Sequence, residues 1–211
     1  GRELTDPAAL GIGTIDFDDS STLATWLSDK GYRTGLFGKY LNGYASLWTV
    51  PNTPYVPPGW DDWHAILEDR PAGNLDYWMN ENGKLVKPLE YQTEKLAGVV
   101  ESFVRETAGK APFFVYLAPG APHMPAEPAP RHAKLNYGYD LTTAVLHVSL
   151  IVRGPSVRAQ KLDGVVSTMD VAPTIANLLR LQRKPPFEGA SLAPELFDGK
   201  SKRPAQLHHQ F

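Results

Sequence analysis

Three stretches of the chain carry apolar residues at the spacing of an amphipathic helix. The first begins after the polar run 20–22, which offers a helix cap, and ends at Gly31. The second covers 90–107, and the third starts at Asp170 with Pro173 in its first turn. We expect the following side chains to face the core: Leu23, Trp26 and Leu27; Leu96, Val99, Val100, Phe103 and Val104; Ile175, Leu178 and Leu179.

Short apolar runs between these helices predict β-strands. The clearest run is 113–118, and two others cover 33–38 and 148–152. Asn82 and Gly83 have the sequence of a tight hairpin turn between two further short apolar pairs. Because strands alternate with helices, the pattern predicts an α/β fold with parallel strands.

The composition indicates a folded domain and excludes several other classes of protein. The 211 residues are 42% hydrophobic, which argues against disorder. With 21 Lys and Arg against 23 Asp and Glu, the net charge is -2, so we expect no nucleic-acid partner. The lack of cysteine excludes disulfides, thiolate metal sites and a cysteine nucleophile within these residues. No apolar run approaches the ~18 residues of a membrane helix, so we expect no membrane span, and the sequence has no signal-peptide pattern.

Two candidate functional side chains directly follow predicted strands. Lys39 comes after the strand that ends at Gly38, and His123 lies in a proline-rich loop, 119–125, after the strand 113–118. Loops at the carboxyl ends of parallel strands form the crevice of an α/β sheet. The spacing alone supports no more than an anion site. A solvated surface lysine and a structural histidine remain the alternatives at this point.

Longer strings of residues resemble a known family, in the same order along the chain. They cover 22–34, 38–44, 56–63, 113–125, 150–155, 166–175 and 189–192. String 38–44 reads Gly-Lys-Tyr-Leu-Asn-Gly-Tyr, and string 121–125 reads Ala-Pro-His-Met-Pro. On these motifs the chain resembles the sulfatase family, in the branch of N-acetylglucosamine-6-sulfatases, arylsulfatases and heparan-type endosulfatases. The resemblance implies an alkaline-phosphatase-like fold, with a mostly parallel sheet flanked by helices, which is incomplete in this chain.

The resemblance also implies an activity, the hydrolysis of sulfate esters, with a sulfated carbohydrate or aryl sulfate as partner. Intact family members use a formylglycine nucleophile, made from the first residue of a Cys/Ser-x-Pro-x-Arg motif, and a calcium ion. Lys39 matches the family lysine that binds the sulfate, and Asn42 matches a position that can orient the substrate. His123 matches the histidine beside the sulfate and the leaving oxygen, where its intrinsic acidity suits proton donation. Family members are periplasmic, secreted or lysosomal, and the residues leave the compartment open.

The chain departs from the family pattern in several places. It has no Cys/Ser-x-Pro-x-Arg string, and its acidic pairs, Asp18 with Asp19 and Asp61 with Asp62, do not match the family's metal motifs. We therefore expect no metal ligands, no formylglycine and no cofactor within these residues. We expect 1–211 to form a single partial domain, with a poorly matched segment at 1–19, a deletion junction at 137–146 and a tail at 200–211.

Three functions remain open from the sequence. The first is a sulfatase by descent that is inactive as written, because the nucleophile and metal motifs are missing. The second is a phosphate or phosphonate ester hydrolase of the same superfamily, against which string 38–44 argues. The third is a non-catalytic remnant that binds a sulfated glycan or a partner, with aromatic side chains on sugar faces. The candidate aromatic residues are Trp48, Trp60, Trp63 and Trp78, and a role in anchoring loops to the core is the alternative for each.

Overall fold

The computed structural model describes two compact units of the chain. The described residues are 17–44, 54–67, 73–121, 123, 127–132, 150–152, 157, 159–162, 164, 166–181 and 187–198. We call the unit within Arg2–Asp140 the sheet unit and the unit within Leu141–Phe211 the C-terminal unit. The predicted junction at 137–146, the tail at 200–211 and most of 1–19 lie outside the described residues.

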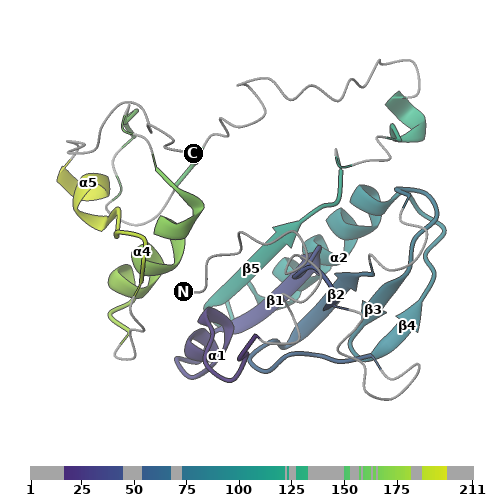
Figure 1. Cartoon of the computed structure of the whole chain (residues 1–211), viewed down its shortest axis with the longest axis horizontal. Helices are drawn as coiled ribbons and strands as arrows, with labels where there is room; N and C mark the ends of the chain where they lie inside the picture. Colours follow the sequence, from purple (N-terminus) through teal and green to yellow (C-terminus); the bar gives the residue numbers. More distant parts are fainter. Residues whose placement is uncertain are drawn as a thin grey trace. The chain divides into compact units, whose positions relative to one another are not determined.

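The sheet unit is built on a mixed sheet whose order is β4-β3-β2-β1-β5 (Figure 1). The central strand β1 pairs in parallel with β2 on one side and with β5 on the other. β3 is antiparallel to β2, and β4 is antiparallel to β3. The strands are β1 Arg33–Gly38, β2 Asp62–Ile66, β3 Met79–Glu81, β4 Lys84–Val86 and β5 Phe113–Ala118. The predicted α/β architecture is confirmed, with the predicted strands 33–38 and 113–118 at the bounds expected.

Local sequence signals explain the helices and turns of this unit. In α1, Leu23–Ser28, the side chain of Thr22 and that of Thr25 each accept a hydrogen bond from the other residue's backbone, which closes a capping box. The second predicted helix is observed as α2, Gln92–Thr107. Asn82 and Gly83 both have positive φ, 50° and 84°, as the predicted hairpin turn between β3 and β4 requires. A short 3-10 helix, η3, follows at Pro130–His132.

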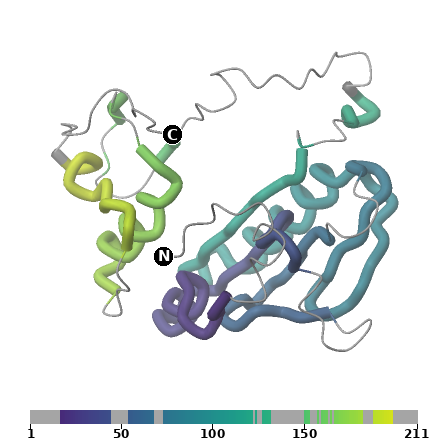
Figure 2. The backbone as a smooth tube through the Cα atoms, in the orientation of Figure 1, coloured from purple at the N-terminus to yellow at the C-terminus, as the bar shows by residue number. Residues whose placement is uncertain are grey.

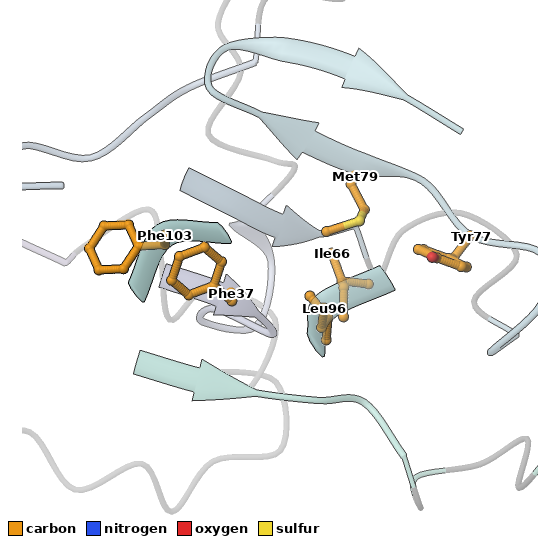
Figure 3. Packing of buried hydrophobic residues seen from close by; sticks show 6 residues of the cluster. All are labelled: Phe37, Ile66, Tyr77, Met79, Leu96 and Phe103. Atoms are coloured by element: carbon orange, nitrogen blue, oxygen red, sulfur yellow. The ribbon is translucent and has the colours of Figure 1, made fainter. Parts of the chain in front are cut away.

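One face of the sheet packs against α2. Phe37 from β1 and Phe103 from α2 meet edge to face with ring centroids 5.4 Å apart, and both are buried. Figure 3 shows the six buried side chains of this layer: Phe37, Ile66, Tyr77, Met79, Leu96 and Phe103. Val99, Val100 and Val104 pack against them, so the predicted apolar stripe of α2 faces the sheet as expected.

The sequence pattern did not predict β2. Only Trp63, Ala65 and Ile66 among its residues are apolar, so the segment shows no continuous apolar run. The fold makes it a strand by pairing it between β1 and β3 and by giving its polar side chains partners. The Nε2 atom of His64 lies 3.0 Å from Oδ1 of Asp62, and its ring stacks on Phe37 with centroids 5.5 Å apart.

The C-terminal unit contains a 3-10 turn followed by two helices, which can be followed along the tube in Figure 2. These are η4 Thr168–Asp170, α4 Val171–Leu178 and α5 Ala193–Asp198. Asp170 precedes α4 as predicted, but its carboxylate accepts hydrogen bonds from the amides of Ser167, at 2.9 Å, and Ala190, at 2.7 Å, rather than capping the helix. Through this carboxylate the loop before α5 is held at the start of α4.

Two expectations for the C-terminal unit are wrong. Leu178 is 38% exposed, whereas Pro173, Thr174 and Ala176 form the buried side of α4. The described part of the expected strand 148–152 is irregular, with Ile151 88% exposed, while residues 148 and 149 lie outside the described residues. An apolar run is extended into a strand only when a neighbouring strand takes its hydrogen bonds. No helix in the part of the chain that the structure describes is long and apolar enough to cross a membrane.

Candidate functional site

The carboxyl ends of β1 and β5 lie next to each other (Figure 1). Gly38 and Ala118, the last residues of the two strands, are paired, and the amide of Lys39 donates to the carbonyl of Ala118 at 2.7 Å. Gly38 has φ of +118°, and a Cβ atom there would lie 2.0 Å from the oxygen of Ala118. The glycine is therefore required for the close approach that places Lys39 directly beside the end of β5.

Aromatic contacts hold the residues that follow Lys39 in the sequence. The ring of Tyr40 meets the rings of Trp63 and Tyr44 edge to face, with centroids 5.0 and 5.6 Å apart. Burial raises the pKa of Tyr40 above its ordinary value, so its phenol stays neutral at physiological pH. Lys39 itself is half-buried, and Asn42 is exposed. The backbone of the motif is thus anchored while Asn42 faces solvent.

A buried hydrogen-bond network holds the residue that ends this motif. The hydroxyl of Tyr44 accepts hydrogen bonds from Nε1 of Trp63 at 2.8 Å and from Nδ2 of Asn80 at 2.6 Å. The same hydroxyl donates to the carbonyl of Tyr55, to which Asn80 also donates at 2.8 Å. Sequence reasoning did not identify this network, because its members come from four separate segments. It ties the loops after β1 to β2 and β3.

His123 lies beyond the end of β5 and is exposed. Its amide donates to the carbonyl of Gly120 at 2.9 Å, which forms a tight turn after the strand. The amide of Gly120 donates to Oε1 of Gln92, the first residue of α2, at 2.9 Å. Lys39 and His123 therefore follow neighbouring parallel strands, as predicted. That their side chains share one anion site with Asn42 stays a prediction from the sequence.

The acidic pair at 18–19 is used in local structure. Oδ1 of Asp18 accepts from the amide and hydroxyl of Ser20, at 3.0 and 2.6 Å, and these bonds hold the pKa of Asp18 below its ordinary value. Oδ2 of Asp19 accepts from the hydroxyl of Tyr55 at 2.6 Å. Both carboxylates thus have partners within the sheet unit.

The second acidic pair, Asp61 with Asp62, is built into the edge of a strand, because Asp62 begins β2. Oδ2 of Asp61 accepts from the amide of Thr34 at 2.8 Å and lies 3.2 Å from the Thr34 hydroxyl, which fixes the loop before β2 onto β1. Burial alone would raise the pKa of Asp62, but hydrogen bonds from His64 and Asn82 hold it below its ordinary value.

Within the described segments, no group of three or more His, Asp or Glu side chains is placed to hold a metal ion. Calcium takes six to eight oxygen ligands, and the absence of the family's calcium ligands from this chain stays a prediction from the sequence.

The candidate tryptophans that the structure describes lie in the core or pack against it. Trp63 is fully buried, so it cannot stack on a sugar. Trp60 and Trp78 are partly buried and pack against the cluster around Trp63, which supports their role as loop anchors. Trp60 also meets Tyr116 of β5, which is 49% exposed, with ring centroids 6.5 Å apart. Trp48 lies outside the described residues.

Comparisons with known proteins agree with the motifs and the fold. The family model named Sulfatase matches residues 13–144. The extracellular sulfatase SULF-1 homolog of Drosophila melanogaster is 28% identical over 202 residues, which are 92% of this chain and 17% of that protein. The N-acetylglucosamine-6-sulfatase of Homo sapiens is 34% identical over 109 residues, which are 49% of this chain and 19% of that protein. The chain therefore spans less than a fifth of the length of these two relatives.

A solved structure from work on the metabolism of glycosaminoglycans by Bacteroides thetaiotaomicron is also similar. It has a TM-score of 0.61 and 16% identity, and the match covers 90% of this chain and 60% of that one. At this identity the likeness bears on the fold alone. Together with the family model it confirms the predicted alkaline-phosphatase-like fold, of which the chain contains a part.

Proposed function

This chain belongs to the sulfatase family, and from that premise we propose that it binds sulfate esters of sugars where β1 and β5 end. One observation carries the proposal: β1 and β5 are parallel neighbours, and the amide of Lys39 is bonded to the last residue of β5. The loop that contains His123 starts from the same end of the sheet. The carboxyl edge of such a sheet is where α/β proteins bind ligands.

Each of the three candidate residues makes a different interaction with the ester, according to its chemistry. The ammonium group of Lys39 offsets the charge of the sulfate. The imidazole of His123 donates a hydrogen bond to the oxygen that joins sulfur to the sugar. Asn42, which is exposed, offers an amide to a sugar hydroxyl.

The substrate class that we propose is N-acetylglucosamine 6-sulfate or a glycan that carries it. The support is the named activity of the human relative, which is 34% identical over 109 residues. The string Gly-Lys-Tyr-Leu-Asn, 38–42, lies within the part of the chain that resembles this branch of the family.

We further propose that these 211 residues bind the ester without hydrolysing it. Hydrolysis needs an attacking group as well as charge stabilisation and a proton donor. The sequence contains no cysteine and no Ser-x-Pro-x-Arg string, so it offers no precursor of the family's nucleophile. A sulfate-release assay with N-acetylglucosamine 6-sulfate and added calcium should give no product above the uncatalysed rate. Release of sulfate that Lys39→Ala abolishes would contradict this part of the proposal.

Replacing Lys39 by alanine should weaken binding of N-acetylglucosamine 6-sulfate by about 1–3 kcal/mol, the range for a hydrogen bond to a charged group. Isothermal titration calorimetry measures the change. The matched control is Lys84→Ala, because Lys84 is an exposed lysine on β4, the strand at the opposite end of the sheet order. The control should bind like the parent. Equal affinity in the parent and Lys39→Ala would refute the site, and tighter binding of the 6-phosphate than of the 6-sulfate would favour a phosphate ester as ligand.

A further inference from the structure

The loop that bears His123 is held at its start by a buried side chain from another element. Gln92 begins α2 and is only 3% exposed. Its Oε1 atom accepts the amide hydrogen of Gly120 at 2.9 Å, across 28 positions of sequence. A buried amide oxygen is costly to leave without a hydrogen bond, so this contact is a strong constraint on the backbone of Gly120.

The contact continues directly to His123. The carbonyl of Gly120 accepts the amide hydrogen of His123 at 2.9 Å, so both backbone groups of Gly120 are used. The fit around Gly120 is close, because a Cβ atom there would lie 2.5 Å from Oε1 of Gln92. A Cβ atom at 120 would therefore force the end of the Gln92 side chain away from the Gly120 amide.

The far end of the loop is tied to the same region. Oε2 of Glu127 accepts the amide of Asn74 at 2.8 Å, and the carbonyl of Glu127 accepts from Nδ2 of Asn74 and from the hydroxyl of Tyr91 at 3.3 and 2.9 Å. The carbonyl of Asn74 in turn accepts the amide of Gln92 at 2.8 Å. The segment around Tyr91 and Gln92 thus bonds to both Gly120 and Glu127, which bracket His123.

We propose that Gln92 is a positioning residue that determines the position of His123 relative to the bound ester. Gln92 does not touch the ligand and acts through Gly120. The proposal rests on the proposed function, since it assigns a role in that site. Holding the turn in one place before binding reduces the conformational entropy lost on binding and fixes the backbone position of His123.

A double-mutant cycle tests the proposal. Gln92→Leu removes the acceptor at similar volume, and Gln92→Glu keeps an acceptor oxygen at the same position. We expect Gln92→Leu to weaken binding of N-acetylglucosamine 6-sulfate about tenfold, and Gln92→Glu to restore most of that affinity. In the His123→Ala background, Gln92→Leu should cause almost no further loss, because its effect passes through His123. Losses that simply multiply in the double variant would overturn the proposal.

NMR without ligand tests the positioning role independently of ligand binding. It also provides a test if one of the variants fails to fold. If the parent chain binds no sulfated sugar, the proposed function fails, and the positioning role is judged from the imidazole signals of His123 and the hydrogen exchange of the Gly120 amide. Both should change in Gln92→Leu and remain near the parent in Gln92→Glu. If Gln92→Leu does not fold, Gly120→Ala strains the same contact from the loop side and should move the same signals. His123 signals that stay unchanged while the Gly120 contact is lost would contradict the role.

Discussion

Replacing Phe103 by alanine should lower the free energy of unfolding of the sheet unit by about 3–5 kcal/mol, the usual cost of removing a buried aromatic side chain. Phe103 is 1% exposed and lies between α2 and the sheet (Figure 3). Its ring meets those of Phe37 and Phe113, at 5.4 and 6.1 Å between centroids, and the guanidinium of Arg33 lies 4.8 Å above it. The substitution therefore opens a cavity and removes contacts with two strands at once.

Urea unfolding followed by circular dichroism measures this loss. Ser102→Ala is the matched control, because Ser102 is the preceding residue of the same helix and is exposed. We expect the control to stay within about 0.5 kcal/mol of the parent. A loss of under about 1 kcal/mol in Phe103→Ala would mean that α2 does not pack on the sheet as described.

Gly38→Ala should destabilise the sheet unit by about 2–4 kcal/mol and remove the affinity for N-acetylglucosamine 6-sulfate as well. The new Cβ atom would lie 2.0 Å from the backbone oxygen of Ala118, and the residue would keep a φ of +118°. To relieve this clash, the ends of β1 and β5 must separate. The separation breaks the hydrogen bond between the Lys39 amide and Ala118.

Gly98→Ala is the control for this change. Gly98 lies inside α2, and nothing stands within 4 Å of a Cβ atom placed there. Alanine in a helix interior is favoured over glycine, so the control should raise the free energy of unfolding by about 0.5–1 kcal/mol. The two Gly→Ala changes thus have opposite expected signs in the same denaturation assay. Destabilisation of similar size by both would argue that the tight join at Gly38 is not present in solution.

The sequence predicts those elements whose signals are local. α1 has its cap at Thr22, α2 has a regular apolar stripe, and β5 is an unbroken apolar run, so all three are found where expected. β2 was missed because two of its residues, Asp62 and His64, are polar. Nε2 of His64 pairs with Oδ1 of Asp62 at 3.0 Å inside the fold, and no pattern along the chain reveals that pairing in advance.

The residues of the candidate site also differ in whether the sequence alone could identify them. Lys39 and His123 could be named from the sequence, because each directly follows a strand and matches a family motif. Gln92 could not, because its partner, Gly120, is 28 positions away and a glutamine at the start of a helix has no distinctive pattern. The role of the Tyr44 hydroxyl likewise could not be predicted, because its partners Trp63 and Asn80 are brought to it by β2 and β3. Contacts between distant segments are what the sequence alone leaves undetermined.

The central claim is that one sulfate-ester site forms where β1 and β5 end. An NMR titration of the amide-labelled chain with N-acetylglucosamine 6-sulfate tests it most directly, with N-acetylglucosamine as the unsulfated control. We predict that the amide signals of Lys39 and Asn42 and those of Gly120 and His123 shift together with one affinity, and that the unsulfated sugar leaves them in place. Shifts at only one of the two loops, or shifts confined to other parts of the chain, would contradict the claim.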